Sequence, residues 1–133
     1  MSRRAERRAA AFLLYQRDLM DGEFEPLYVA YTRDNGEPVS DYTRRQTEGV
    51  WRERERLDRA IDAAAEGWTS ERMAVLERNI LRLAVWELGD GEIPAAVAID
   101  EAVTLAKRYA SPEAASLVNG ILGRIARTEG VGT

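Results

Sequence analysis

The stretch that decides the fold is residues 77–122, ERNILRLAVWELGDGEIPAAVAIDEAVTLAKRYASPEAASLVNGIL. It contains three segments whose apolar residues recur with the 3.6-residue period of helices. Gly89 follows the first segment, Pro94 precedes the second, and Ser111 with Pro112 precede the third, as expected of residues that end and begin helices. The first segment is apolar nearly all round, which predicts that it forms the central and most buried helix.

The rest of the chain also has helical periodicity, so we predict an all-α fold. A first helix is expected over residues 3–20, a long middle helix over residues 41–66 after Ser40 as N-cap, and a helix from Ser70 to Leu88. The last two helices should begin near Pro94 and Pro112, the second of them ending near Arg127. The predicted inward stripe of the first helix is Ala9, Phe12, Leu13, Gln16, Leu19 and Met20.

Residues 21–39 have the weakest pattern in the chain. They contain Gly22, Pro26, Gly36 and Pro38, which favour a loop with room for one short helix. Residues 27–32 fit either a strand or a helix.

Length and composition bound the class of protein. A chain of 133 residues with 45% hydrophobic residues is enough for one domain with one core. No apolar run approaches the roughly 20 residues of a membrane span, and there is no cysteine, so we expect a soluble, cytoplasmic protein. There is also no histidine and no phosphate-binding glycine loop, and we therefore expect neither catalytic activity, nor a metal, nor a cofactor.

Positive charge is concentrated at the N-terminus although the net charge is −4. Four arginines, Arg3, Arg4, Arg7 and Arg8, are expected opposite the predicted core stripe, where they would form one exposed basic surface suited to phosphate groups. A solvated face without a ligand is the alternative. Leu14 and Tyr15 fall on the same outward side, and they would either bind a protein or pack under residues 21–39.

Two further clusters have both a structural and a functional interpretation. Arg78, Arg82 and Trp86 could bind single-stranded RNA, but in a central helix they are better explained by pairing with acids and packing on the middle helix. Glu87 lies near the apolar stripe of that helix and should be paired or cap a neighbour. On the last helix, Ser116, Asn119, Gly120, Gly123 and Arg127 share the face opposite the core. Its two glycines suggest a close approach of backbone, to another helix more often than to RNA.

The landmarks RxxILRLAxWEL, IPxxVAIDEAVxLAKRY and LVNGIL closely resemble the C-terminal half of the bacterial antitermination factor family NusB. The resemblance implies one NusB-like domain with an N-terminal helical part over about residues 1–66 and a C-terminal part over about 70–127. It also implies binding of boxA-type single-stranded RNA from ribosomal RNA operon leaders, together with the small-subunit ribosomal protein NusE, within the RNA polymerase antitermination complex.

The resemblance also assigns residues to these partners. RNA contacts fall on Arg3, Arg4, Arg7, Arg8, Glu113, Leu117, Asn119 and Gly120. NusE contacts fall on Tyr15, with Leu14 beside it, and on Glu77. Family members often carry Gln at the position of Phe12, Ser at Ala114 and Phe at Leu117, and the last difference removes a ring that could stack on a base.

Two alternatives to an antitermination factor remain open from the sequence. One is a helical RNA-binding module related to those of ribosomal RNA methyltransferases, and the other is a protein-binding adaptor without RNA affinity. The outward Leu14 and Tyr15 would also suit a homodimer.

Overall fold

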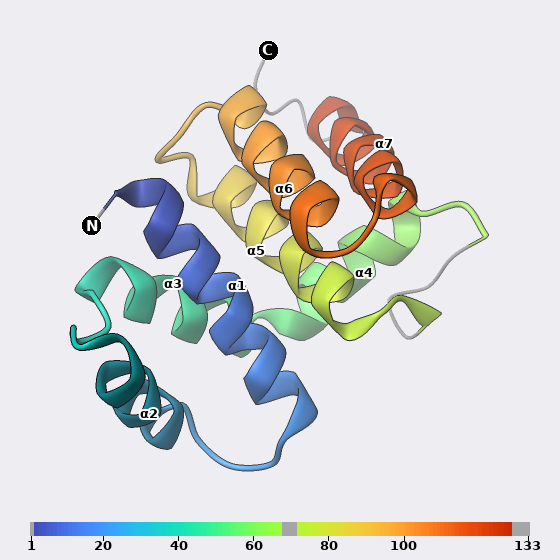
Figure 1. The fold of residues 1–133 in the computed structure, drawn as a ribbon. Coiled ribbons are helices and arrows are strands. Elements are labelled where there is room, and N and C mark those ends of the chain that lie inside the picture. Colours follow the sequence, from blue (N-terminus) through green and yellow to red (C-terminus); the bar gives the residue numbers. More distant parts are fainter. Residues whose placement is uncertain (1, 68–71, 129–133) are drawn as a thin grey trace.

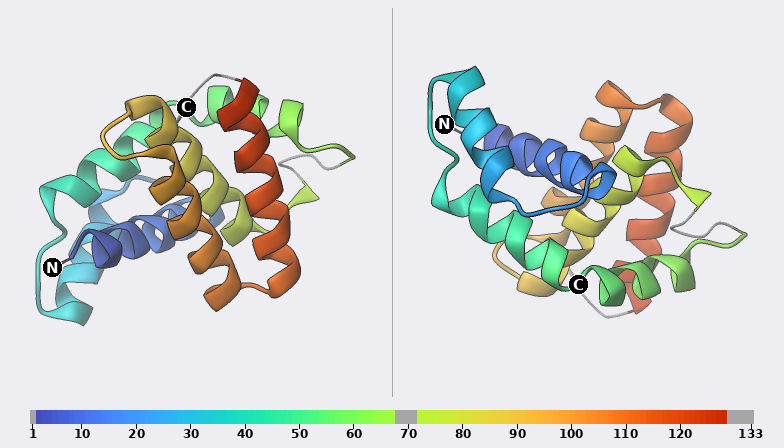
Figure 2. Two further views of the ribbon diagram at one scale, coloured as in Figure 1. Left: turned by 90° about the horizontal axis from the view of Figure 1, so that it is seen from above. Right: turned by 90° about the horizontal axis from the view of Figure 1, so that it is seen from below.

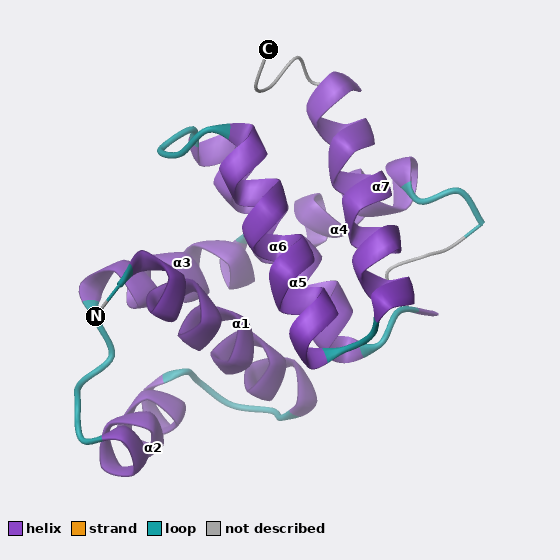
Figure 3. Ribbon diagram, turned by 45° about the horizontal axis from the view of Figure 1, so that its top comes forward, coloured by secondary structure: helices purple, strands orange, loops and turns teal. Residues whose placement is uncertain are grey.

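The computed structural model describes residues 2–67 and 72–128. Within these ranges the chain is helical and contains no strand, which confirms the all-α prediction (Figures 1 and 3). The helices are α1 (Arg3–Leu19), α2 (Glu25–Asn35), α3 (Asp41–Arg52), α4 (Arg54–Ala64), α5 (Val75–Asp90), α6 (Ala95–Tyr109) and α7 (Pro112–Thr128).

The central helix is α5, as the sequence predicts. It packs against α1, α3, α4, α6 and α7, and its buried residues include both faces of the helix, among them Ile80, Leu81, Leu83 and Val85. The pair α6 and α7 lies on one side of α5, and α1 with α3 lies on the other (Figure 2). The buried apolar side chains form one cluster that includes residues of all seven helices.

The long middle helix predicted over residues 41–66 is wrong, because it is broken at Glu53 into α3 and α4. The two halves have different neighbours: α3 packs on α1 and α5, whereas α4 packs on α5 and α7. One straight helix could not serve both sets of contacts. The division of the chain into two parts near residues 66–70 stays a prediction.

Three other boundaries differ from the prediction. α5 begins after Ala74, not after Ser70, which lies outside the described residues. α5 also continues through Gly89 and ends where Gly91 takes the left-handed conformation, with φ 70°. The ambiguous residues 27–32 are helical, since they lie in α2, which has Pro26 in its first turn and a left-handed Gly36 after its last residue.

The predicted inward stripe of α1 is partly wrong. Ala10, Ala11 and Leu14 are buried, whereas Leu19 is 56% exposed and Met20 is 54% exposed. The reason is that α1 lies against α3 and α5 through a face rich in alanine, which lets helix axes approach closely. The large apolar residues that define the sequence pattern are therefore not all on the buried side.

The interpretation of Arg78, Arg82 and Trp86 as structural residues is confirmed. Asp18 accepts hydrogen bonds from Arg78 (Nη2 to Oδ2, 2.7 Å) and from Arg82 (Nη1 to Oδ2, 3.1 Å). Arg82 also donates two 2.7 Å bonds to Asp58 of α4. Arg82 is buried, and its ion pairs with two acids join α5 to α1 and α4.

Trp86 packs on α3 at Gly49. A Cβ atom on Gly49 would lie 2.8 Å from Cζ2 of the indole ring, closer than carbon atoms come without displacement. The glycine is therefore required by the approach of the ring to the backbone of α3.

Asp18 gives the fold a measurable dependence on pH. Burial disfavours its charged form, but hydrogen bonds from Arg78 and Asn79 and the charge of Arg82 outweigh burial, and its pKa lies below the ordinary 3.8. A carboxylate whose pKa falls on folding stabilises the folded state above its ordinary pKa, and this contribution is lost as the pH falls through the folded-state value.

We predict that Asp18→Asn lowers the free energy of unfolding by roughly 1.5–3 kcal/mol at pH 7, the usual contribution of hydrogen bonds to charged groups. The difference from the wild type should shrink as the pH falls below 3.8, because the carboxyl is then protonated in the unfolded chain, and it should vanish below the lower pKa of the folded state. Urea unfolding followed by circular dichroism between pH 2.5 and 7 measures it. A difference that is constant over this range would contradict the assignment.

Candidate nucleic-acid and partner interface

The N-terminal arginines of α1 do not share one exposed surface. Arg3 and Arg4 are exposed and Arg8 is partly exposed, but Arg7 is 5% exposed, so its predicted place on the surface is wrong. Arg7 lies three and seven residues before Ala10 and Leu14, which places it on the buried side of α1. Its Nε donates to Oε2 of Glu87 on α5 at 2.8 Å.

Glu87 is paired, as its position near the apolar stripe predicts. Burial raises the pKa of its carboxyl above the ordinary 4.5, and the hydrogen bond and charge of Arg7 offset this only in part. The negative charge of Glu101 adds to the increase. The pair is thus a structural contact between α1 and α5, and Arg7 is not available to a ligand.

The remaining arginines form a smaller basic surface with one unpaired member. Nη1 of Arg3 lies 2.9 Å from Glu6, and its guanidinium lies over the ring of Tyr42. Nη2 of Arg4 lies 3.2 Å from Glu101. Arg8 has no ion pair within the described part of the chain. Exposed ion pairs are weak, so Arg4 can exchange its carboxylate for a phosphate group at little cost, whereas the partner of Arg3, Glu6, is buried.

The outer face of α7 is open. Glu113, Asn119 and Gly120 are exposed and Leu117 is partly buried, whereas the predicted core residues of α7, such as Val118 and Leu122, are buried. A Cβ atom on Gly120 would meet nothing within 4 Å, so the interpretation of this glycine by helix packing is wrong. At Gly123 a Cβ atom would come 3.3 Å from Nη1 of Arg127, a side chain of α7 itself.

The structure joins only part of the predicted RNA surface. The rings of Phe12 and Tyr109 are in contact, with centroids 5.0 Å apart, and link the outer side of α1 to the end of α6. Pro112, which begins α7, follows Tyr109 by three residues. Among the described residues, no hydrogen bond or ion pair joins Asn119 or Gly120 to the arginines of α1.

Of the three residues assigned to a protein partner, Tyr15 and Glu77 lie together in the structure and Leu14 does not lie with them. Tyr15 of α1 and Glu77 of α5 line one groove of about 470 Å³, although 62 positions separate them in the sequence. Leu14 is 0% exposed, so its predicted outward place is wrong. The other residues that line this groove, which we call the partner groove, are Leu19, Ala74, Val75, Leu76, Tyr109, Ala110 and Ser111.

Sequence periodicity places Phe12 and Leu19 in the core, whereas in the structure both line surface grooves. The alanines at positions 9–11 are the signal that could have placed Phe12 and Leu19 on the surface. Small residues in a helix suggest that this part of it lies close to a neighbouring helix.

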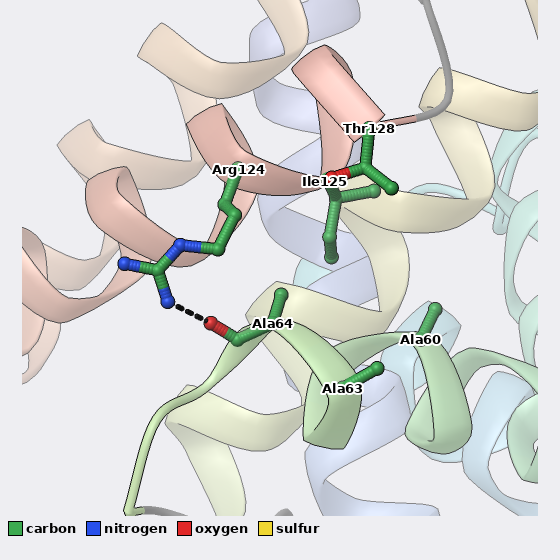
Figure 4. Close-up of a pocket in the computed structure, with 6 residues that line it drawn as sticks. All are labelled: Ala60, Ala63, Ala64, Arg124, Ile125 and Thr128. Carbon is green, nitrogen blue, oxygen red and sulfur yellow. Dashed lines mark hydrogen bonds between the residues drawn. The ribbon is translucent and has the colours of Figure 1, made fainter.

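A separate small cavity of about 130 Å³ lies between α4 and α7 (Figure 4). Arg124 crosses it and donates to the carbonyl oxygen of Ala64. Its other lining residues are Ala60, Ala63, Ile125 and Thr128, none of which is a predicted site residue. In the described ranges, no helix has the length and apolarity for a membrane crossing, and no cluster of three or more acidic, histidine or cysteine side chains is placed to hold a metal ion.

Comparison with known proteins identifies the family. The sequence profile of the NusB family matches residues 4–127. This chain belongs to the NusB family. It is 46% identical over 123 residues to the transcription antitermination protein NusB of Rubrobacter xylanophilus, covering 92% of this chain and 88% of that protein.

Solved NusB structures have the same fold. The chain matches T. maritima NusB with a TM-score of 0.84 and 34% identity, over 96% of this chain and 92% of that one. It also matches, with a TM-score of 0.84 and 27% identity, a crystal structure of antitermination factors NusB and NusE in complex with dsRNA, over 95% of this chain and 96% of that one.

We predict that the buried pair makes Arg7 in this NusB family member a stability residue. Arg7→Met leaves Glu87 buried without its partner and should lower the free energy of unfolding by about 3–5 kcal/mol. The double variant Arg7→Met/Glu87→Met should recover much of this loss, because neither charge then remains buried. Urea unfolding measures both.

The matched control is Arg8→Met, which removes a partly exposed arginine of the same helix that has no ion pair among the described residues, and it should change the free energy by less than about 0.5 kcal/mol. An Arg7→Met variant as stable as this control would show that the pair does not hold α1 on α5.

Proposed function

We propose that this protein is a transcription antitermination factor that binds boxA-type single-stranded RNA of ribosomal RNA operon leaders together with NusE. The observation that carries the proposal is the placement of two surfaces on α1. Exposed arginines lie at its N-terminal end, and Tyr15 lies beside Glu77 near its other end. Two surfaces on one helix allow an RNA and a protein to be bound at the same time. The solved complex of NusB and NusE with dsRNA supports the joint binding of an RNA and NusE by this fold.

The proposed RNA surface combines charge with an open helix face. Arg3, Arg4 and Arg8 would contact phosphate groups, which gives affinity without sequence preference. On α7, the amide of Asn119 would hydrogen-bond to the RNA, and Gly120 would let the chain of the RNA approach the backbone. Glu113 would accept hydrogen bonds from base amino groups or 2′-hydroxyls, and Leu117 would make an apolar contact.

The proposed NusE surface is the partner groove. Tyr15 offers a large, partly exposed ring, and Glu77 a carboxylate at its edge. Leu14 supports the groove from the core without contacting the partner. A second copy of this chain could use the same groove, so a homodimer would compete with NusE.

This function implies a place in the RNA polymerase antitermination complex, in the cytoplasm, with no catalytic step of its own. The two alternatives, a module related to ribosomal RNA methyltransferases and an adaptor without RNA affinity, are not favoured. The relatives that match nearly the whole chain are antitermination proteins.

We predict that replacing Arg3, Arg4 and Arg8 together by Gln flattens the dependence of log affinity on log salt by up to about 2 units, since each phosphate contact on single-stranded RNA contributes about 0.7. Asn119→Ala should weaken binding without changing the slope, because a neutral amide releases no counterions. Fluorescence anisotropy of a labelled boxA-type RNA over a KCl series measures both. An unchanged slope in the triple variant would place the phosphate contacts elsewhere.

We also predict that Tyr15→Ala and Glu77→Ala each weaken NusE binding, by roughly 1–3 kcal/mol for the ring, while helical content is kept. Calorimetry with purified NusE measures the affinity. Val29→Ala, which truncates an exposed apolar residue of α2 outside the partner groove, is the control and should bind normally. Leu14→Ala should instead lower the free energy of unfolding by about 2–5 kcal/mol, as for a core leucine. Normal NusE binding by both groove variants would rule this groove out.

A further inference from the structure

A second groove shares Arg8 with the proposed RNA surface and Tyr109 with the partner groove, and its other lining residues have no role in the proposals above. It lies where α1 passes between α2 and α6 (Figure 3) and has a volume of about 430 Å³, within the range of sites for small ligands. We call it the aromatic groove. Its lining residues are Ala5, Arg8, Ala9 and Phe12 of α1, Tyr31 and Asn35 of α2, Glu37 after α2, and Tyr109 of α6.

The walls of the aromatic groove carry three rings. Phe12 and Tyr109 meet at 84° with centroids 5.0 Å apart, an edge-to-face pair, and Tyr31 stands on the α2 side. In an edge-to-face pair one ring presents only its edge to the other, so its own faces stay available for stacking. The two helices that bring these rings together are far apart in sequence, and the pair is exposed to solvent on the groove side.

The aromatic groove is lined by charges of both signs. Arg8, which has no ion pair among the described residues, lines it, and the guanidinium of Arg108, beside the lining residues, lies 5.4 Å from the centre of the Tyr109 ring. Asn35 and Glu37 lie on the α2 side. Asn35 already donates its Nδ2 to the carbonyl oxygen of Tyr31, so its Oδ1 and the carboxylate of Glu37 offer hydrogen-bond acceptors.

We propose that the aromatic groove holds one unstacked base of the single-stranded RNA, an inference that rests on the proposed function. The base stacks against the pair of Phe12 and Tyr109, and its phosphate lies at Arg8 and Arg108. The acceptors of Asn35 and Glu37 face the edge of the base and favour one with an exocyclic amino group over uracil. Glu37 repels phosphate, which fixes the direction in which the nucleotide lies.

The test uses the full chain and a boxA-type single-stranded RNA that carries 2-aminopurine at one position at a time, since stacking on an aromatic ring quenches this base. One position should be quenched by the wild type more than its neighbours. Phe12→Leu and Tyr109→Leu should each remove that quenching and weaken affinity about 5- to 100-fold, the equivalent of one stacked base. The double variant should lose little more than either single one, because both rings serve one base.

Arg8→Gln should behave differently from the ring variants. It should weaken binding and lower the salt slope by about 0.7 while the quenching at saturation is kept, because the ring contact is unchanged. Two matched controls separate the groove from general effects. Val29→Ala truncates an exposed apolar side chain of α2 outside the groove, and Arg33→Gln removes an exposed arginine of the same helix. Both should bind RNA alone like the wild type.

The outcomes separate this subsite from the proposed function. If the wild type binds the RNA but both ring variants keep the affinity and the quenching, the subsite is overturned and the function stands. If Val29→Ala loses as much affinity as Phe12→Leu, or if the ring variants weaken NusE binding and not RNA binding, the subsite is also overturned. A wild type that binds no RNA, with or without NusE, would overturn the proposed function and the subsite with it.

Discussion

Two sets of ionic contacts, one buried and one partly buried, hold α1 against α5, and the positions of the candidate functional residues on α1 follow from them. Arg7 pairs with Glu87, and Asp18 pairs with Arg78 and Arg82. These contacts lie 11 residues apart on α1, about 16 Å at the rise of a helix, and 9 residues apart on α5, about 14 Å. They follow in opposite order along the two helices. A helix fixed at two distant points can neither slide nor turn about its axis. Buried ion pairs add little net stability compared with apolar contacts, but breaking one is costly, so their main effect here is on register.

The fixed rotation of α1 decides which side chains reach solvent. Ala10 and Leu14 face α5, and consequently Arg8, Phe12 and Tyr15 face outward along three successive turns. A turn of about 100° per residue means that a shift of α1 by one position would bury one of these side chains. The proposed RNA surface, the aromatic groove and the partner groove therefore depend on the same contacts, although none of the paired residues lines either groove.

The sequence predicted those parts of the fold that local signals determine. Pro94, Ser111 and Pro112 mark the starts of α6 and α7, and the apolar character of α5 identifies it as central, because these signals act within a few residues. It failed where the answer lies in a distant partner. The burial of Arg7 requires Glu87, 80 positions away, and the break at Glu53 reflects the packing of α4 on α7. The pairing of Tyr15 with Glu77 in one groove came from the family resemblance and not from periodicity.

The errors on α1 also show why a hydrophobic pattern can assign residues of a surface groove to the core. Phe12 and Leu19 were assigned to the core because they are large and apolar, yet both line grooves open to solvent. The buried side of α1 instead uses alanines, whose small size lets α1 lie close to its neighbours. An apolar residue that binds a base or a partner satisfies the same periodicity as one that packs inside, since both lie on one side of a helix. Only the positions of α3 and α5 separate the two cases, because they determine which side of α1 is covered by the protein itself and which is left open.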